Sequence, residues 1–87
     1  MKIVAKPVDA IAVFKGSGHP RPYKFRFRDA DGSGQEVRVD QVISAEERRV
    51  AGIQTIVYDC QSTVDGVQKR YQLKYLVREC RWELYKI

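Results

Sequence analysis

Alternation of side-chain character in two segments constrains the fold of this chain most. Residues 71–78 and 23–28 alternate large apolar side chains with mostly polar or basic ones. Because a β-strand points successive side chains to opposite faces, both segments are predicted strands with one packed face and one face that carries Lys and Arg. We therefore expect an all-β protein, with a small antiparallel, strongly bent sheet or an SH3-like barrel of about six strands.

The expected strands form one domain that spans residues 1–87, since a chain of 87 residues buries one thin core and leaves no room for a second. The strands are predicted at residues 8–14, 23–28, 35–43, 51–63, 67–78 and 81–87. Ser44 and Glu47 have the spacing of a helix capping box, but Gly52 follows too soon for a long helix. Either a single helical turn or a bent, solvent-facing strand is expected there.

Two predicted hairpins set the pairing of strands. Asp65-Gly66 is a strong signal for a two-residue turn and places Val64 opposite Val67. In that register one face of the hairpin collects core residues, namely Ile56, Tyr58, Cys60, Tyr71, Leu73 and Tyr75. Residues 29–34 are dense in turn formers and predict a second hairpin, with Phe27 opposite Val37 and Phe25 opposite Val39.

The charged face of this second hairpin follows from the same register. It pairs Arg28 with Glu36 and Lys24 with Asp40, and opposite charges across strands are favourable. It also places Arg26 opposite Arg38, which is repulsive unless an anion lies between them.

Charge, hydropathy and cysteine content limit the partners and the compartment. The formal net charge is +5 and is spread evenly along the chain, which favours anionic partners. No apolar run approaches the roughly 20 residues of a membrane-spanning helix, and residues 1–7 lack the apolar segment of a secretory signal. We expect a cytoplasmic protein with no membrane partner. Cys60 and Cys80 are then expected to be reduced and buried.

Motifs for metal binding and catalysis are incomplete. Asp29, Asp31 and Asp40 match parts of a calcium loop, but Glu36 occupies an apolar position of that loop and strand-like alternation flanks it, so a plain hairpin turn is expected. The Gly-rich segment 16–18 lacks the remaining residues of a phosphate-binding loop. His19 has no acid–base partner nearby in sequence. We expect no metal, no cofactor and no enzymatic activity.

Two basic stripes are the main functional clue. One comprises Lys24, Arg26, Arg28 and Arg38, and the other comprises Arg70, Lys74 and Arg78. Such strand faces can hold a nucleic-acid backbone by charge, and nearby rings can stack on bases. Five aromatic residues of the same strands fall on the inward phase and are expected in the core: Tyr23, Phe25, Phe27, Tyr71 and Tyr75. The alternative is an ordinary solvated charged face.

A second candidate surface is apolar. Ile53, Val57 and Leu76 lie on the strand face opposite the predicted core residues. This surface would seat a partner protein or a second copy of the chain. If the bent sheet encloses that face, the same residues are core instead.

Three segments, residues 22–27, 37–42 and 81–86, resemble a group of short uncharacterised bacterial all-β proteins. An Arg-rich strand, a V-x-V strand and a closing W-x-L strand are similar to small domains of unknown function encoded near translesion DNA polymerase genes. The matching residues belong to strands and core, so no functional residue is carried over. The resemblance implies a DNA-associated accessory role.

Our leading prediction is a noncatalytic module that binds nucleic acid, and the alternative is a protein-interaction or self-association module.

Overall fold

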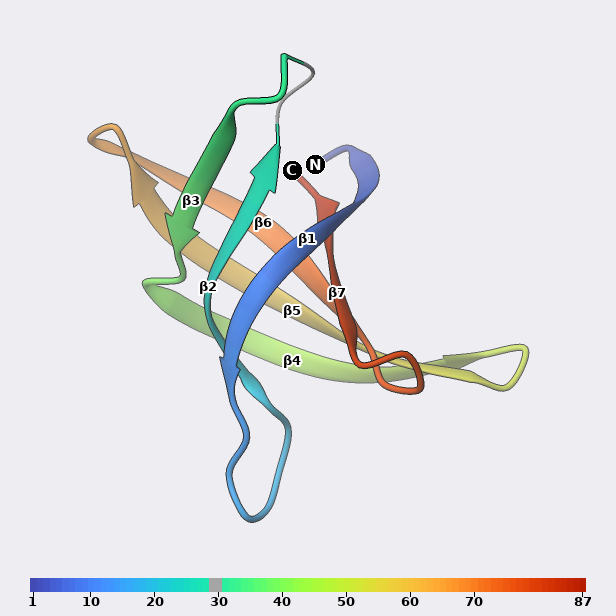
Figure 1. Ribbon diagram of the computed structural model, residues 1–87. Coiled ribbons are helices and arrows are strands. Elements are labelled where there is room, and N and C mark those ends of the chain that lie inside the picture. The colour runs from blue at the N-terminus through green and yellow to red at the C-terminus, as the bar shows by residue number, and fades with distance from the viewer. Residues whose placement is uncertain (29–30) are drawn as a thin grey trace.

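The computed structural model describes residues 1–28 and 31–87, which form seven antiparallel strands and no helix. The strands are β1 (Ile3–Val13), β2 (Arg21–Arg28), β3 (Gly34–Arg38), β4 (Gln41–Val50), β5 (Ile53–Val64), β6 (Val67–Leu76) and β7 (Arg81–Lys86). They lie in one sheet of order β3-β2-β1-β7-β6-β5-β4. The sheet curls strongly into a half-barrel (Figure 1). The predicted all-β class and the strongly bent antiparallel sheet are confirmed.

The connection between β3 and β4 brings the two edges of this sheet together. Consecutive strands pair throughout except for β3 and β4, and β1 pairs with β7. At the corner, the Val39 amide donates to the Tyr23 carbonyl of β2 at 2.8 Å, and the Asp40 amide donates to the Gln61 carbonyl of β5 at 3.1 Å. The predicted strand 35–43 is therefore split in two, which is why the described residues form seven strands where about six were expected.

Residues 44–47 belong to β4. Of the two alternatives for this segment, the helical turn is therefore wrong, and the solvent-facing strand is the one that the structure shows. Ser44 lies opposite Asp59 and its hydroxyl donates to that carboxylate at 3.1 Å, which favours the ladder over a helix cap. The pairing runs on to Val50 opposite Ile53. Between them Ala51 and Gly52 both have positive φ and form a two-residue turn, so β5 begins two residues later than predicted.

The core lies on the concave side of the half-barrel. The predicted register of the β5–β6 hairpin is confirmed, with Val64 opposite Val67 and Cys60 opposite Tyr71. Asp65 and Gly66 both have positive φ, as the predicted turn requires. All six residues predicted for the core face of this hairpin are buried, together with Phe25, Val37, Val39, Trp82 and Leu84.

The β2–β3 hairpin has a register two residues away from the predicted one. Phe25 lies opposite Val37, and Arg26 lies opposite Glu36 in place of Arg38. A shift of two keeps every side chain on its face, so the apolar residues stay inside. The observed register places Arg26 opposite an acid, but Lys24 now stands opposite Arg38, so one like-charge pair remains across the two strands.

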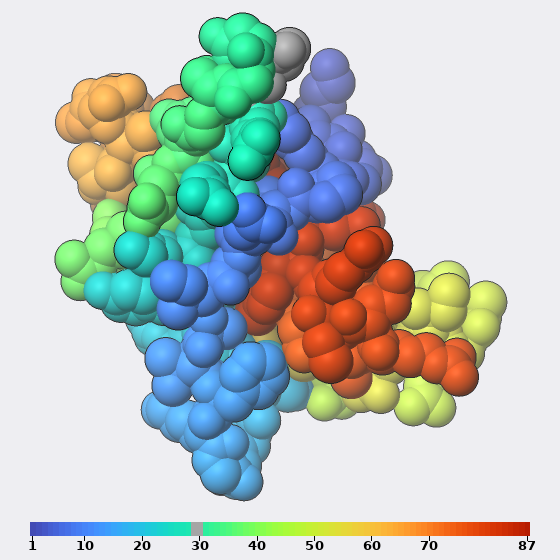
Figure 2. Space-filling model, viewed as in Figure 1, coloured from blue at the N-terminus to red at the C-terminus, as the bar shows by residue number. Residues whose placement is uncertain are grey.

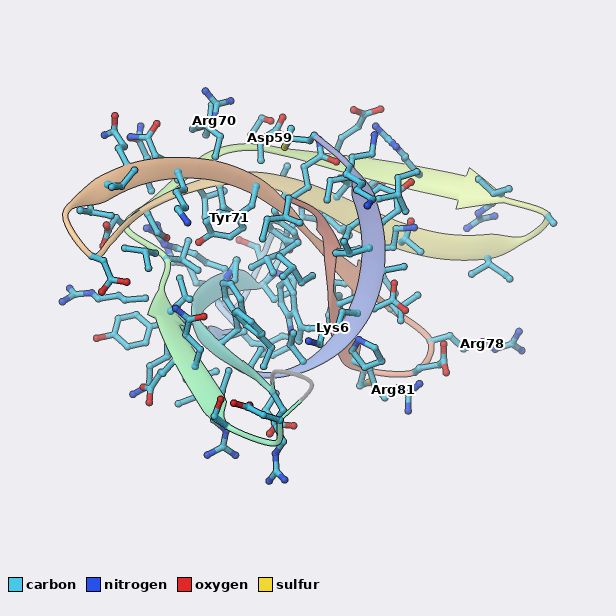
Figure 3. The ribbon with its side chains drawn as sticks, turned by 90° about the horizontal axis from the view of Figure 1, so that it is seen from above. Lys6, Asp59, Arg70, Tyr71, Arg78 and Arg81 are labelled. Atoms are coloured by element: carbon cyan, nitrogen blue, oxygen red, sulfur yellow. The ribbon has the colours of Figure 1, made fainter. Side chains whose placement is uncertain are left out.

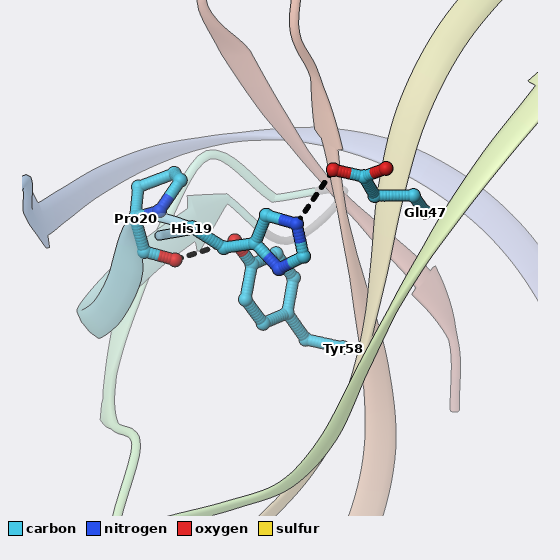
Figure 4. A network of polar contacts seen from close by, with 4 residues as sticks. All are labelled: His19, Pro20, Glu47 and Tyr58. Carbon is cyan, nitrogen blue, oxygen red and sulfur yellow. Dashed lines mark hydrogen bonds and ion pairs between the residues drawn. The ribbon is translucent and has the colours of Figure 1, made fainter. Parts of the chain in front are cut away.

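One end of the half-barrel, which we call the covered end, carries residues 14–20, where Phe14 to His19 are exposed and Pro20 is buried. The Phe14 ring meets Tyr75 edge-on with centroids 6.1 Å apart. The Tyr58 hydroxyl donates to the Pro20 carbonyl, and the His19 imidazole contacts Glu47 of β4 at 2.7 Å (Figure 4). Burial raises the pKa of the Tyr58 hydroxyl. The other end holds both chain termini, where backbone bonds join Lys2 and Ile87 (Figure 1).

A buried polar chain ties the β3–β4 corner to β5 and β6. The Ser62 hydroxyl donates to the Arg38 carbonyl at 2.6 Å, so its oxygen accepts from the Tyr71 hydroxyl at 2.5 Å. Burial raises the pKa of the Tyr71 hydroxyl to about 12, which keeps it a donor. This series of hydrogen bonds gives each of the three polar groups a partner, with the Ser62–Tyr71 bond buried and the Ser62–Arg38 bond part-buried.

We expect Ser62→Ala to lower the free energy of unfolding by about 1–3 kcal/mol, because it leaves the Arg38 carbonyl and the Tyr71 hydroxyl without a partner. Urea unfolding followed by circular dichroism measures this change. The matched control is Thr63→Val, which removes an exposed hydroxyl and keeps the branched shape. It should change stability by less than about 0.5 kcal/mol. Equal effects of the two substitutions would contradict the role given to Ser62.

Candidate nucleic-acid interface

The two predicted basic stripes lie on different walls of the half-barrel. Lys24, Arg26 and Arg28 belong to β2, whereas Arg70 and Lys74 belong to β6, and β1 and β7 separate these strands. Arg78 follows the end of β6 and lies in the turn before β7, so it does not share a strand face with Arg70. Figure 3 shows Arg70 and Arg78 pointing away from the sheet in different directions. The seven residues do not form one continuous surface.

On the outer face of β2, two of the predicted cations are paired with acids. The Lys24 Nζ lies 2.7 Å from Glu36 Oε1, and the Arg26 guanidinium lies 3.0 Å from Asp9 Oδ2. The hydrogen bond and charge of Lys24 lower the pKa of Glu36, and Glu36 raises the pKa of Lys24. Both pairs are exposed and add little stability, but they reduce the positive charge of this face.

Asp40 does not pair with Lys24 as the predicted register required. It lies at the β3–β4 corner, where its carboxylate accepts the Thr63 amide at 2.8 Å. Lys24 instead stands opposite Arg38. Arg28 and Arg38 enter no ion pair within the described residues, so the outer faces of β2 and β3 keep a positive charge between them.

Tyr23 is the residue that sequence reasoning placed wrongly. Ala12 pairs with Pro22 and Ile11 pairs with Lys24, so the ladder skips Tyr23 and bulges there. The bulge turns Tyr23 outward with 45% of its surface exposed, and the Arg38 guanidinium carbon lies 5.7 Å from its ring centroid. Pro22 gave a signal, since proline within a strand marks an edge or a bulge. The other four aromatic residues follow the predicted inward phase, with Phe27 partly buried.

We call this surface the β2–β3 face and define it by Tyr23, Lys24, Arg26, Arg28 and Arg38. A shallow cavity of about 280 Å³ lies on it. Its lining residues are Asp9, Ala10, Ile11, Lys24, Phe25, Arg26 and Glu36. The face thus combines an exposed aromatic ring, three arginines and a lysine with two acids.

The wall formed by β6 and β7 has different chemistry. Lys74 lies 3.8 Å above the Tyr85 ring centroid, and Lys86 lies 5.4 Å from the same centroid. Lys74 also stands opposite Glu83. The Tyr85 ring is therefore covered by cations, and bases have less access to it than to Tyr23.

The predicted apolar surface is largely dispersed by the fold. Val57 is only 4% exposed and Leu76 is partly buried, so neither offers much contact area. Ile53 is 56% exposed and lies opposite Val50, which is 70% exposed. This pair is at the tip of the β4–β5 hairpin, which projects beyond the body of the molecule at the right of Figure 2.

Asp31 and His19, two described residues of the motifs considered for metal binding and catalysis, make structural contacts. Asp31 accepts the Ser33 amide at 2.9 Å and the Ser33 hydroxyl at 2.7 Å, and these bonds lower the pKa of Asp31. Asp29 of the calcium-like motif lies outside the described residues. In the parts of the chain that are described, no group of three or more His, Cys, Asp or Glu side chains gathers as a metal site requires. His19 and Glu47 form an exposed pair, and within the same residues no hydroxyl or thiol bonds to that imidazole.

Comparisons with known proteins find no matching family model, no matching curated protein and no matching solved structure. The resemblance to small bacterial all-β proteins therefore stays a prediction. The described residues include no helix with the length and apolarity needed to cross a membrane.

The two free cysteines differ in environment. Cys60 is buried as predicted, whereas Cys80 is exposed because it ends the turn between β6 and β7. Burial raises the pKa of the Cys60 thiol to about 12, so this thiol stays protonated near neutral pH.

We expect Ellman's reagent to modify Cys80 rapidly in the folded protein at about pH 8, and Cys60 only after denaturation, because the thiolate is the reactive form. Absorbance of the released thiolate measures both rates. Cys80→Ser is the control and should abolish the fast reaction. A fast reaction that survives in this variant would show that Cys60 is accessible.

Proposed function

We propose that the protein is a noncatalytic module that binds single-stranded nucleic acid on the β2–β3 face. The observation that carries this proposal is the contact of Arg38 with the exposed Tyr23 ring. Arg28 lies farther along β2 on the same outer face, opposite Gly34. Single-stranded nucleic acid is bound by surfaces that combine rings for base stacking with cations for the backbone. The bacterial cytoplasm is the proposed location, and two free cysteines suit a reducing compartment.

Charge and shape favour this face over the wall formed by β6 and β7. The Tyr23 ring has one cation near it, whereas two lysines lie near the Tyr85 ring. Asp9 and Glu36 hold Arg26 and Lys24 in exposed ion pairs. Arg38 stands opposite Lys24 and Arg28 opposite Gly34, so the two arginines would contact different phosphates of one strand. Such contacts leave both ion pairs intact, so binding does not require the pairs to break. A single strand suits a curved face better than a stiff duplex does.

The first test is fluorescence anisotropy of labelled single-stranded DNA and RNA, with duplexes of the same sequence, at low and moderate salt. We expect single strands to bind more tightly than duplexes. The variant Arg28→Glu/Arg38→Glu should weaken binding at low salt by more than about tenfold, since it replaces two phosphate contacts by repulsion. No binding of any probe at low salt would contradict the proposal.

The matched control is Arg70→Glu/Arg78→Glu on the other side of the molecule. It lowers the formal net charge from +5 to +1, as the first variant does. If the β2–β3 face is the site, the control retains most of the affinity. Equal losses in both variants would show that binding follows net charge and has no preferred face.

A third variant separates stacking from charge. Tyr23→Ala should cost about 1–3 kcal/mol of binding free energy and leave the dependence on salt unchanged. Two neutral substitutions, Arg28→Gln/Arg38→Gln, should instead reduce the slope of log affinity against log salt by about 1.4. Unchanged affinity after Tyr23→Ala would remove the ring from the site.

A second candidate function is self-association through the β4 edge. β4 ends the sheet, and its hairpin tip exposes Val50 and Ile53 side by side. Edge strands with apolar tips can pair with a second copy. The predicted residues Val57 and Leu76 contribute little because they are buried or partly buried.

If this candidate is correct, sedimentation velocity should show a dimer whose stability changes little with salt. Val50→Lys/Ile53→Lys should then dissociate it, because two lysines on each hairpin tip repel those of the other copy. Val67→Lys on the β5–β6 hairpin is the control at another exposed apolar site. A monomer at all concentrations would contradict this candidate.

A further inference from the structure

We propose that the end of the half-barrel opposite the covered end binds a small anionic amphiphile, with an apolar body inside and its anionic group at the rim. The site is distinct from the β2–β3 face and does not depend on nucleic-acid binding. It is a cavity of about 310 Å³ on the inner side of the sheet. This volume lies at the lower end of the range of small-molecule sites.

The walls of the cavity are apolar and come from both halves of the sheet. Phe27 and Val37 of the β2–β3 hairpin face Val64 and Leu84 of the opposite strands across it. These residues continue the hydrophobic core, since Val37 and Leu84 are buried and Phe27 and Val64 pack against it. Ile87 also lines the cavity, so the cavity lies toward the end that holds the two chain termini (Figure 1).

Two lysines give the rim its charge. Lys69 lines the cavity and shares the inward phase of Tyr71 on β6. The Lys6 Nζ lies 5.2 Å from the centroid of the Phe27 ring, and Figure 3 shows Lys6 turned toward the interior. Arg70 also borders the cavity, but its side chain points outward in the same view.

Among the described residues that line the cavity there is no Asp or Glu side chain, and the charged lining side chains are those of Lys69 and Arg70. Asp31 and Asp65 belong to the turns of the two neighbouring hairpins. Two inward lysines above an apolar cavity select a ligand with one carboxylate, sulfonate or phosphate group and a short acyl chain or fused-ring body. A neutral or cationic amphiphile of equal size lacks the charge-assisted bonds to the rim.

The test uses the full chain and the fluorescent probe anilinonaphthalene sulfonate, displaced by decanoate, by decanol or by decyltrimethylammonium. These competitors share the same alkyl chain, so they differ in the head group alone. We expect decanoate to displace the probe at a concentration about tenfold lower than decanol does, the gain from one charge-assisted contact. Decyltrimethylammonium should be the weakest competitor. Equal potency of the three would overturn the proposal.

Variants locate the site and identify its cations. Lys6→Gln/Lys69→Gln should abolish the preference for decanoate over decanol. The control Lys15→Gln/Arg78→Gln removes the same charge at two residues that do not line the cavity, and it should preserve the preference. Val64→Trp fills the cavity and should reduce binding of every competitor. Wild-type binding in Val64→Trp, with its fold checked by amide NMR spectra, would overturn the proposal.

Amide NMR shifts during a decanoate titration give an independent readout. Changes confined to the neighbourhood of Val37, Lys69 and Leu84 support the site. Changes centred on Tyr23 or on Val50 would instead place the ligand on another surface and overturn it. Because this titration contains no nucleic acid, its failure leaves the proposed function untouched, and failure of the anisotropy test leaves this site untouched.

Discussion

The curl of the sheet depends on how the chain turns at residues 39 and 40. Two successive backbone amides leave that corner in different directions, one to Tyr23 of β2 and the next to Gln61 of β5. β3 and β4 are therefore consecutive in sequence but lie at opposite edges of the sheet. Ser62 adds a buried bond to the Arg38 carbonyl at the same place. In a low-dielectric interior such a bond is strong when made and costly when lost, so it favours the curled sheet over a flat one.

The curl also decides which side chains can act together. β2 and β6 both direct their large apolar side chains inward, so their charged phases point to different sides of the molecule. Alternation in sequence gives the phase of each strand but not the angle between two strands. Seven basic residues that look equivalent in sequence are consequently divided between two walls and a turn.

The register of a hairpin was easier to predict from the sequence when its turn was short. Asp65 and Gly66 leave only two residues between β5 and β6, so the register of that hairpin and its six core residues were predicted correctly. The segment between β2 and β3 is longer and allows several registers, and the predicted one was wrong by two residues. Ala51 was missed as a turn residue because alanine rarely adopts the positive φ that it has here.

The candidate site was predictable only in part, for a related reason. Lys24, Arg26 and Arg28 were placed on one face by alternation alone, and β2 does present them together. The ring beside them depends on a bulge, which breaks the alternation on which the prediction relied. The cavity depends on the distance between strands that are far apart in sequence, so no local pattern could indicate it.

The two sites that we propose, on the inner and the outer face of the half-barrel, therefore differ in their chemistry. A bulge moves Tyr23 from the core to the surface, where it meets Arg38, and the strand returns to its inward phase by Phe25. On the inner side Phe27 ends the same run of aromatic residues and meets Lys6 at the cavity rim. One strand, β2, thus supplies a ring beside a cation to each face. Substitutions outside β2 are accordingly the ones that separate the two proposed sites, because Arg38 contributes to the outer face alone and Lys69 to the inner cavity alone.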